Sequence, residues 1–217
     1  ATRFGDLFTP RQALALTTFC GLVRELSSQS AELDDAGLAP AVTAVLALSI
    51  SRLADICSAG CRWENTKTQV RNYFTRQALP LVWDFAEPSL LGDAAGDHGV
   101  TLGTMVQVIE RHIDTPGRSS VQAMDAASHP LPDDTAALYA TDPPYYDAVP
   151  YAYLSDFFYV WLRRALGTPH AVGCADTVVP KDAEIVVDRP HELSDSHKDI
   201  AFYEKGLGAA FAEGRRI

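Results

Sequence analysis

The sequence predicts an α/β fold in which a mostly helical lobe, residues 1–116, precedes part of an α/β domain, residues 117–217. Three observations support this prediction. Apolar residues recur at helical spacing through the first half, short β-prone runs replace them after Pro116-Gly117, and two amphipathic helical stretches close the chain. No internal repeat or low-complexity tract is evident, so we expect one helical lobe joined to part of a sheet.

Two long helices are expected in the first part. Thr9 can cap the first helix, Pro10 suits its first position and Gln12 can complete a capping box, and the helix should continue to about residue 33. A second helix should run over residues 40–58, and the following Gly60 should end it. Helical spacing predicts core-facing residues Leu14, Thr18, Leu22, Val23 and Leu26 in the first helix, and Val42, Val45, Leu46, Ser49, Leu53 and Ile56 in the second.

The remaining elements are shorter. Further helical pieces are expected at residues 67–78 and 103–113, with an exposed loop at 87–99 between them. Residues 119–124 and 137–141 resemble strands, the second of them buried. Two helices, about residues 153–166 and 199–216, should close the chain, facing the core through Leu154, Phe157, Phe158, Trp161, Leu162 and Ala165, and through Ala201, Phe202, Leu207, Ala210 and Phe211.

Composition is that of a folded, acidic chain. Hydrophobic residues make up 47% and charged residues 21%, which is far from the disordered class. The net charge of -10 repels phosphate, and the nearest approaches to a basic cluster are Arg163-Arg164 and Arg215-Arg216, so the chain by itself is expected to bind DNA poorly. The longest apolar stretch, residues 39–50, is shorter than the roughly 20 residues that span a bilayer, so we expect no membrane span and a cytoplasmic location.

The four cysteines are Cys20, Cys57, Cys61 and Cys174. Only Cys57 and Cys61 are neighbours, one helical turn apart, and no matching Cys or His pair stands nearby to complete a zinc site. We therefore expect reduced, structural thiols and no metal.

The segment Asp142-Pro143-Pro144-Tyr145 directly follows the predicted buried strand, at the edge where open α/β sheets place their active sites. Asp142 can supply a carboxylate and Pro143 a carbonyl, two acceptors that can take both hydrogens of a planar conjugated amine and leave its nitrogen lone pair free to attack. The successive prolines stiffen the loop and remove donors, and Tyr145 offers an aromatic face for stacking. The alternative is an ordinary polyproline turn.

These four residues form the DPPY motif of amino-group methyltransferases. The surrounding segments ATDPPYYDAVPYAYLSDFFYVWLRRAL, RFGDLFTPRQALALTTF and TRQALPLVWDFAE closely resemble large bacterial and archaeal adenine-specific DNA methylases that also contain a zinc ribbon. The resemblance covers most of the chain, residues 4–216. It implies a Rossmann-like methyltransferase sheet, methyl transfer from S-adenosylmethionine to the amino group of adenine in DNA, and a target base flipped into a pocket at Asp142, Pro143, Pro144 and Tyr145.

The resemblance also exposes gaps. Family members carry a glycine-rich cofactor loop and zinc-binding cysteines upstream of the FGDLFTP stretch, and they carry further strands after the last helix. This sequence has neither the upstream features nor the later strands. Gly92, Gly96 and Gly99 form a glycine cluster in a polar loop without a preceding strand, so they do not replace the cofactor loop. The expectation is a fragment, inactive in isolation, that contacts DNA mostly through parts outside the chain and associates with the missing cofactor-binding region.

Four residues are candidates for contacts to the cofactor. Asp125 is a candidate acceptor for the adenine amino group of S-adenosylmethionine, with a simple turn before Ser128 as the alternative. Phe8, Thr9 and Pro10 resemble a segment that touches the methionine part of the cofactor in related methyltransferases, although helix capping already explains them.

Other functions stay open at this point. Cytosine, an RNA base and protein glutamine also present planar conjugated amines, and the leading Asp142 favours adenine over the protein substrate, where Asn usually opens the motif. From a different class, the helical first part could be a non-catalytic interaction module that carries a relic of the loop.

Overall fold

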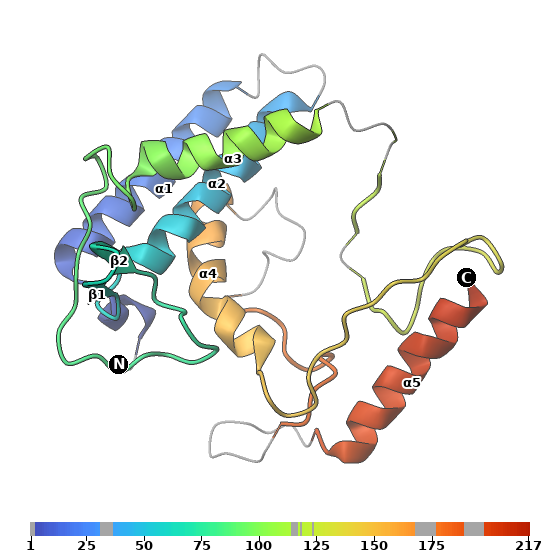
Figure 1. The fold of residues 1–217 in the computed structure, drawn as a ribbon. Coiled ribbons are helices and arrows are strands. Elements are labelled where there is room, and N and C mark those ends of the chain that lie inside the picture. Colours follow the sequence, from blue (N-terminus) through green and yellow to red (C-terminus); the bar gives the residue numbers. More distant parts are fainter. Residues whose placement is uncertain are drawn as a thin grey trace. The chain divides into compact units, whose positions relative to one another are not determined.

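The computed structural model describes residues 3–30, 37–113, 117, 119–122, 124–167, 177–188 and 198–217. Its elements, drawn in Figure 1, are the 3-10 helix η1 (Phe4–Leu7), α1 (Pro10–Ser30), α2 (Leu38–Ile56), β1 (Arg62–Glu64), β2 (Gln69–Arg71), α3 (His98–His112), α4 (Tyr151–Leu166) and α5 (Ile200–Arg216).

The chain forms two compact units. The first unit comprises Ala1–Gly117 and Leu154–Val179, and the second comprises Arg118–Tyr153 and Pro180–Ile217. The first segment of the first unit ends at Gly117, one residue after the boundary expected from the sequence. Most of α4, which was expected in the second part of the chain, belongs to the first unit.

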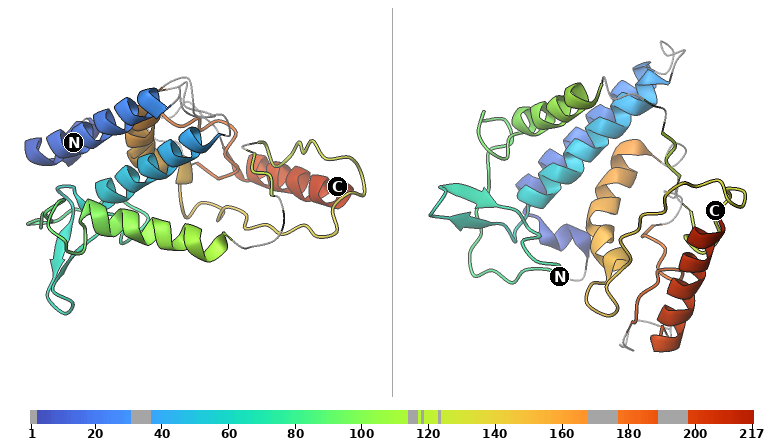
Figure 2. Two further views of the ribbon diagram at one scale, coloured as in Figure 1. Left: turned by 90° about the horizontal axis from the view of Figure 1, so that it is seen from above. Right: turned by 45° about the vertical axis from the view of Figure 1, so that its right-hand side comes forward.

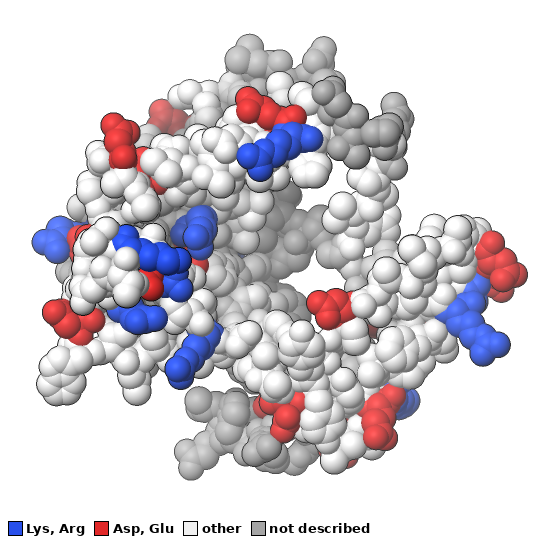
Figure 3. Space-filling view, in the orientation of Figure 1, with Lys and Arg blue, Asp and Glu red and all other residues white. Residues whose placement is uncertain are grey.

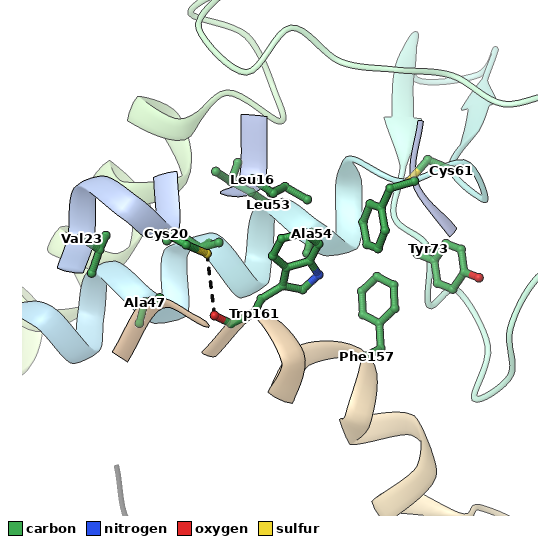
Figure 4. Close-up of a cluster of buried hydrophobic side chains, with 13 residues drawn as sticks. Leu16, Cys20, Val23, Ala47, Leu53, Ala54, Cys61, Tyr73, Phe157 and Trp161 are labelled. Carbon is green, nitrogen blue, oxygen red and sulfur yellow. Dashed lines mark hydrogen bonds between the residues drawn. The ribbon is translucent and has the colours of Figure 1, made fainter. Parts of the chain in front are cut away.

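The core of the first unit lies between α1, α2 and α4. The helices α1 and α2 lie side by side, and α3 packs against α2 (Figure 2). From α4, Phe157, Trp161 and Ala165 enter the same cluster, which confirms the predicted apolar stripe of that helix (Figure 4). Phe157 stacks on Tyr73 at a centroid distance of 5.0 Å, and Trp161 meets the ring of Phe8 edge-on at 5.1 Å.

The start of α1 is confirmed. Gln12 accepts a hydrogen bond from the amide of Thr9 through Oε1 at 2.8 Å, and the amide of Gln12 donates to Oγ1 of Thr9 at 3.2 Å, which is a complete capping box. The predicted inner face is largely wrong, because only Val23 of the predicted set is buried while Leu14, Leu22 and Leu26 are exposed. The buried positions are Gln12, Leu16, Cys20 and Val23, which also follow helical spacing.

The central helix α2 buries its C-terminal half. Ser49 and Leu53 are buried as predicted, whereas Val42 is exposed and Ala47 and Ile50 take its place in the core. By length and apolar composition α2 could cross a membrane, which is weak evidence, since core helices pass the same test. In the apolar window of α2, 44% is buried inside the protein. This does not decide whether the helix crosses a membrane, and the expectation of no membrane span stays a prediction.

The helix predicted over residues 67–78 is wrong. Instead β1 and β2 form an antiparallel hairpin in which Trp63 pairs with Val70, and Thr68 adopts a positive φ of 47° in the turn. The loop after β2 is tied to α2 by the buried Asp55, whose carboxylate accepts from the amide of Phe74 at 3.1 Å and from Nδ2 of Asn72 at 3.1 Å. These tertiary hydrogen bonds outweigh the local helical pattern.

The second unit contains α5 and the loops that precede α4 in the chain. As predicted, α5 forms, with Asp199 accepting from the amide of Phe202 at 2.8 Å as its N-cap. The buried strand predicted over residues 137–141 is wrong for this chain: these residues are exposed and belong to no strand. The neighbouring amides of Asp134 and Ala136 bond instead to the carbonyls of Arg216 and Ile217.

The loss of this strand neither confirms nor excludes the predicted Rossmann-like sheet. Among the described residues, the β1–β2 hairpin is the only sheet, and residues 119–122 and 124 also lie outside any strand. Extended backbone becomes a strand when a neighbouring strand takes up its amides and carbonyls. The α/β class stays a prediction.

Candidate functional site

The Asp142–Tyr145 segment lies in a loop of the second unit that leads into α4. Turns follow it directly: the amide of Ala148 donates to the carbonyl of Tyr145 at 2.9 Å, and the amide of Tyr151 donates to the carbonyl of Val149 at 3.1 Å. Val149 is buried, which fixes the end of this turn. The loop therefore has a defined path between the two prolines and the helix.

A tyrosine of α5 holds the loop. The hydroxyl of Tyr203 donates to the carbonyl oxygen of Pro144 at 3.0 Å, and the ring of Tyr146 meets the ring of Tyr203 edge-on at 5.2 Å. On the other side, the carbonyl of Tyr146 accepts from the amide of Val187 at 2.9 Å. Two segments that are distant in sequence thus fix the backbone immediately after the second proline.

The two acceptors that the sequence singles out are accessible. Asp142 is exposed and Pro143 is half-buried. Within the described parts of the chain, no hydrogen bond engages the carboxylate of Asp142 or the carbonyl of Pro143. Both groups can therefore accept hydrogens from another molecule without first losing an internal partner.

Aromatic and acidic groups surround these acceptors. Tyr145 is 57% exposed, which leaves its ring open for stacking. Partial burial raises the pKa of the Tyr151 phenol, and the neighbouring ionisable groups of Tyr145, Asp142 and Glu184 raise it further. Tyr151 is therefore neutral near pH 7 and can act there as a hydrogen-bond donor.

Sequence reasoning missed Glu184. Its Oε1 accepts from the amide of Ala152 in the first turn of α4 at 2.9 Å, and its Oε2 is buried without a hydrogen-bond partner in the described structure. The side chain therefore caps the helix that follows the loop and adds a second carboxylate to its surroundings. Glu184 lies in a separate stretch of sequence with no motif around it, so no local pattern could have identified it.

Asp125 lies in a local turn. Its carboxylate accepts from the amide of Ala127 at 2.9 Å, and its carbonyl accepts from the amide of Ser128 at 3.1 Å. This is the local turn that the sequence left as the alternative to a cofactor contact. Nothing in the structure tests a cofactor role, which stays a prediction.

Phe8, Thr9 and Pro10 belong to the first unit. Phe8 is buried in the core, stacked on Phe157 at 5.7 Å, and Thr9 caps α1. Pro10 is exposed at the first position of the helix. Packing and capping thus account for Phe8 and Thr9, and the contact to the cofactor stays a prediction.

The glycine cluster does not fit a cofactor loop. The buried Asp97 uses one carboxylate oxygen to accept from the amide of Gly92 at 2.6 Å, and the other to accept from the amide of Gly99 at 2.6 Å. These bonds lower the pKa of Asp97 against the opposing effect of burial. The amides of Gly92 and Gly99, which could otherwise hold an anionic cofactor group, are taken by this side chain.

Burial dominates the chemistry of the cysteines. It raises the pKa of Cys20 to about 11 and that of Cys57 to about 12, and it raises the pKa of Cys61 as well. Such thiols are protonated at neutral pH and are poor metal ligands. A search of the described residues finds no group of three or more His, Cys, Asp or Glu side chains that could hold a metal ion. Cys174 lies outside the described residues.

No protein-family model matches the chain, and no curated protein and no solved structure matches it.

Proposed function

We propose that this chain carries the target-amine loop of a methyltransferase that acts on the amino group of adenine in DNA. One observation carries the proposal: the Asp142 carboxylate and the Pro143 carbonyl are neighbouring acceptors that have no hydrogen-bond partner among the described residues, on a loop that Tyr203 holds through the next carbonyl. The DPPY sequence of the loop and its resemblance to adenine-specific DNA methylases give the choice of substrate.

The chemistry of the loop follows from its acceptors. The exocyclic nitrogen of adenine is a weak nucleophile, since its lone pair is delocalised into the ring. When the Asp142 carboxylate accepts one amino hydrogen and the Pro143 carbonyl accepts the other, the nitrogen becomes more tetrahedral and its lone pair is localised. The exposed ring of Tyr145 stacks on the purine and keeps this geometry.

The methyl donor of this class is S-adenosylmethionine. In the glycine-containing loop and the first turn of α3, the amides of Gly92 and Gly99 are bonded to Asp97, so the residues present do not fit a complete site for it. The isolated chain should therefore bind S-adenosylmethionine weakly or not at all, which calorimetry checks.

The decisive test is Asp142→Ala in the intact protein. Loss of this acceptor should lower the methylation rate of adenine in DNA by about 100-fold or more, on the scale of removing one preorganised hydrogen-bonding group from an active site. Asp182→Ala is the matched control, because Asp182 is an exposed carboxylate of the same unit. Mass spectrometry of nucleosides after the reaction measures the product.

The outcomes separate the alternatives. Methylated cytosine, RNA bases or glutamine in place of methyladenine would keep the loop as an amine site and change its substrate. Full methylation by Asp142→Ala would remove the catalytic role of the loop and leave a non-catalytic module.

A further inference from the structure

The hairpin and the segment after it concentrate positive charge in an acidic protein. Between Gly60 and Trp83 the sequence has four basic residues and a single acidic residue, Glu64, whereas the whole chain has a net charge of -10. In the space-filling view, Lys and Arg side chains gather over the β1–β2 hairpin (Figure 3). The chain therefore contains a local basic region although its total net charge is negative.

The strand register brings two arginines together. Arg62 of β1 lies directly opposite Arg71 of β2. Like charges in opposite positions destabilise a hairpin. The sole acid of the region, Glu64, pairs with Arg71 at 3.3 Å and also accepts hydrogen bonds from Thr66 and Gln69. Arg71 is thereby balanced, and Arg62 is left with an uncompensated charge.

A cavity of about 470 Å³ adjoins this uncompensated charge. Its lining includes Arg62, Arg76, Asn72 and Tyr73, and no carboxylate contributes to it. Neither Arg62 nor Arg76 forms an ion pair within the part of the chain that the structure describes. Two free guanidinium groups at one concavity suit an anion that brings several oxygen atoms.

An exposed indole follows the cavity lining. Trp83 comes directly after Val82 of the lining and is fully exposed, whereas Trp63, which is 52% exposed, lies on the face of β1 opposite to Arg62. Exposed aromatic rings and arginines on one surface are the combination with which proteins stack nucleotide bases and neutralise phosphates. A small inorganic anion would use the arginines alone and leave the indole of Trp83 in water.

We propose that this basic surface binds the phosphate backbone of a nucleic acid, and we define it by Arg62, Lys67, Arg71, Arg76 and Trp83. It deepens the proposed function, on which it rests only for the choice of DNA among nucleic acids. The expectation that the chain by itself binds DNA poorly followed from net charge. The hairpin and its cavity place the basic residues together, and the binding of phosphates depends on that local arrangement.

The test measures binding of the chain to a fluorescein-labelled DNA duplex by anisotropy. We expect a dissociation constant of about 1 to 100 µM that rises with salt concentration, and a loss of about tenfold or more in the double variant Arg62→Gln/Arg76→Gln. The matched control is Arg111→Gln/Arg215→Gln, which removes two exposed arginines from α3 and α5 and should change binding by less than about threefold. Circular dichroism verifies that each variant is folded.

Three results would overturn the proposal: no binding by the unmodified chain at about 100 µM in low salt, equal losses in both double variants, or equal competition by a polyglutamate peptide of matched charge, which would indicate an acidic protein partner. An RNA duplex run in parallel determines whether the surface distinguishes the two sugars. Arg62→Gln/Arg76→Gln leaves every residue of the amine loop in place and Asp142→Ala leaves every residue of this surface in place, so anisotropy with the first variant tests the surface and methylation with the second tests the loop.

Discussion

The first unit buries a continuous apolar core, whereas the second unit is held mainly by hydrogen bonds. In the first, Leu16, Ile50 and Leu53 are fully buried and the rings of Phe157 and Tyr73 stack. In the second, the buried apolar side chains of the described residues are few, namely Val149, Ala152, Val186, Ala210 and Ile217. Side chains such as Arg216 tie its segments together, donating to the carbonyl of His129 at 2.8 Å and to Asp133.

The two units therefore contribute differently, the first mainly to stability and the second to the proposed chemistry. Apolar burial is the dominant favourable term in folding, so the first unit should carry most of the stability. The amine loop needs exposed, unpartnered acceptors, and such groups are compatible with a unit whose polar backbone remains in contact with water. All three tryptophans belong to the first unit, so their fluorescence reports on that unit alone.

The largest expected effect comes from Phe157→Ala. Phe157 is 2% exposed, and its ring lies 5.0 Å from the rings of Tyr73 and Phe74. Its truncation should lower the free energy of unfolding by about 3 to 5 kcal/mol, measured by urea titration of circular dichroism, to which the helices of both units contribute. Phe211→Ala, at a position 47% exposed on α5, should cost less than about 1 kcal/mol. Equal losses would refute the contrast between the units.

Substitutions at two glycines, one in each unit, test the same difference in packing between the units. A Cβ at Gly60 would collide with the ring of Tyr73, and a Cβ at Gly214 would collide with the ring of Tyr139. Tyr73 is 3% exposed and cannot move aside, whereas Tyr139 is 38% exposed. Gly60→Ala should therefore destabilise the protein by about 1 to 3 kcal/mol, and Gly214→Ala by less than about 1 kcal/mol. Thermal unfolding followed by circular dichroism compares them, and a greater loss at Gly214 would contradict the contrast.

The smallest effect is an alkaline loss of stability in the first unit. Unfolded thiols ionise near pH 9.0, while burial holds the folded pKa of Cys20 at about 11 and that of Cys57 at about 12. Above pH 9 the unfolded state binds fewer protons than the folded state, so the free energy of unfolding falls as pH rises. Unfolding titrations at several pH values should give a shallower fall for Cys20→Ala/Cys57→Ala. An unchanged slope would assign the loss to other groups.

Local signals predicted the positions of α1, α2, α4 and α5, although the helix predicted over residues 67–78 is wrong. The capping residue Thr9 marks the start of α1, and the aromatic stripe of α4 identifies Phe157 and Trp161 as core residues. The inner face of α1 was not predictable, because Leu14 and Leu16 both belong to helical repeats and only the packing partners select one. The hairpin was missed because Asp55, which holds the loop after it, lies on another element.

The candidate site likewise combines residues that the sequence identified with residues that only the structure revealed. The sequence alone provided the DPPY loop, because the chemistry of an acceptor pair depends on adjacent residues. The contributions of Tyr203 and Glu184 appear only in the fold, since they reach the loop region from distant segments. The same holds for the basic surface, because charges add according to distance in space. The sequence by itself determined which groups are present and where α1 starts, whereas the tertiary structure decided which groups meet, because contacts between distant segments depend on packing.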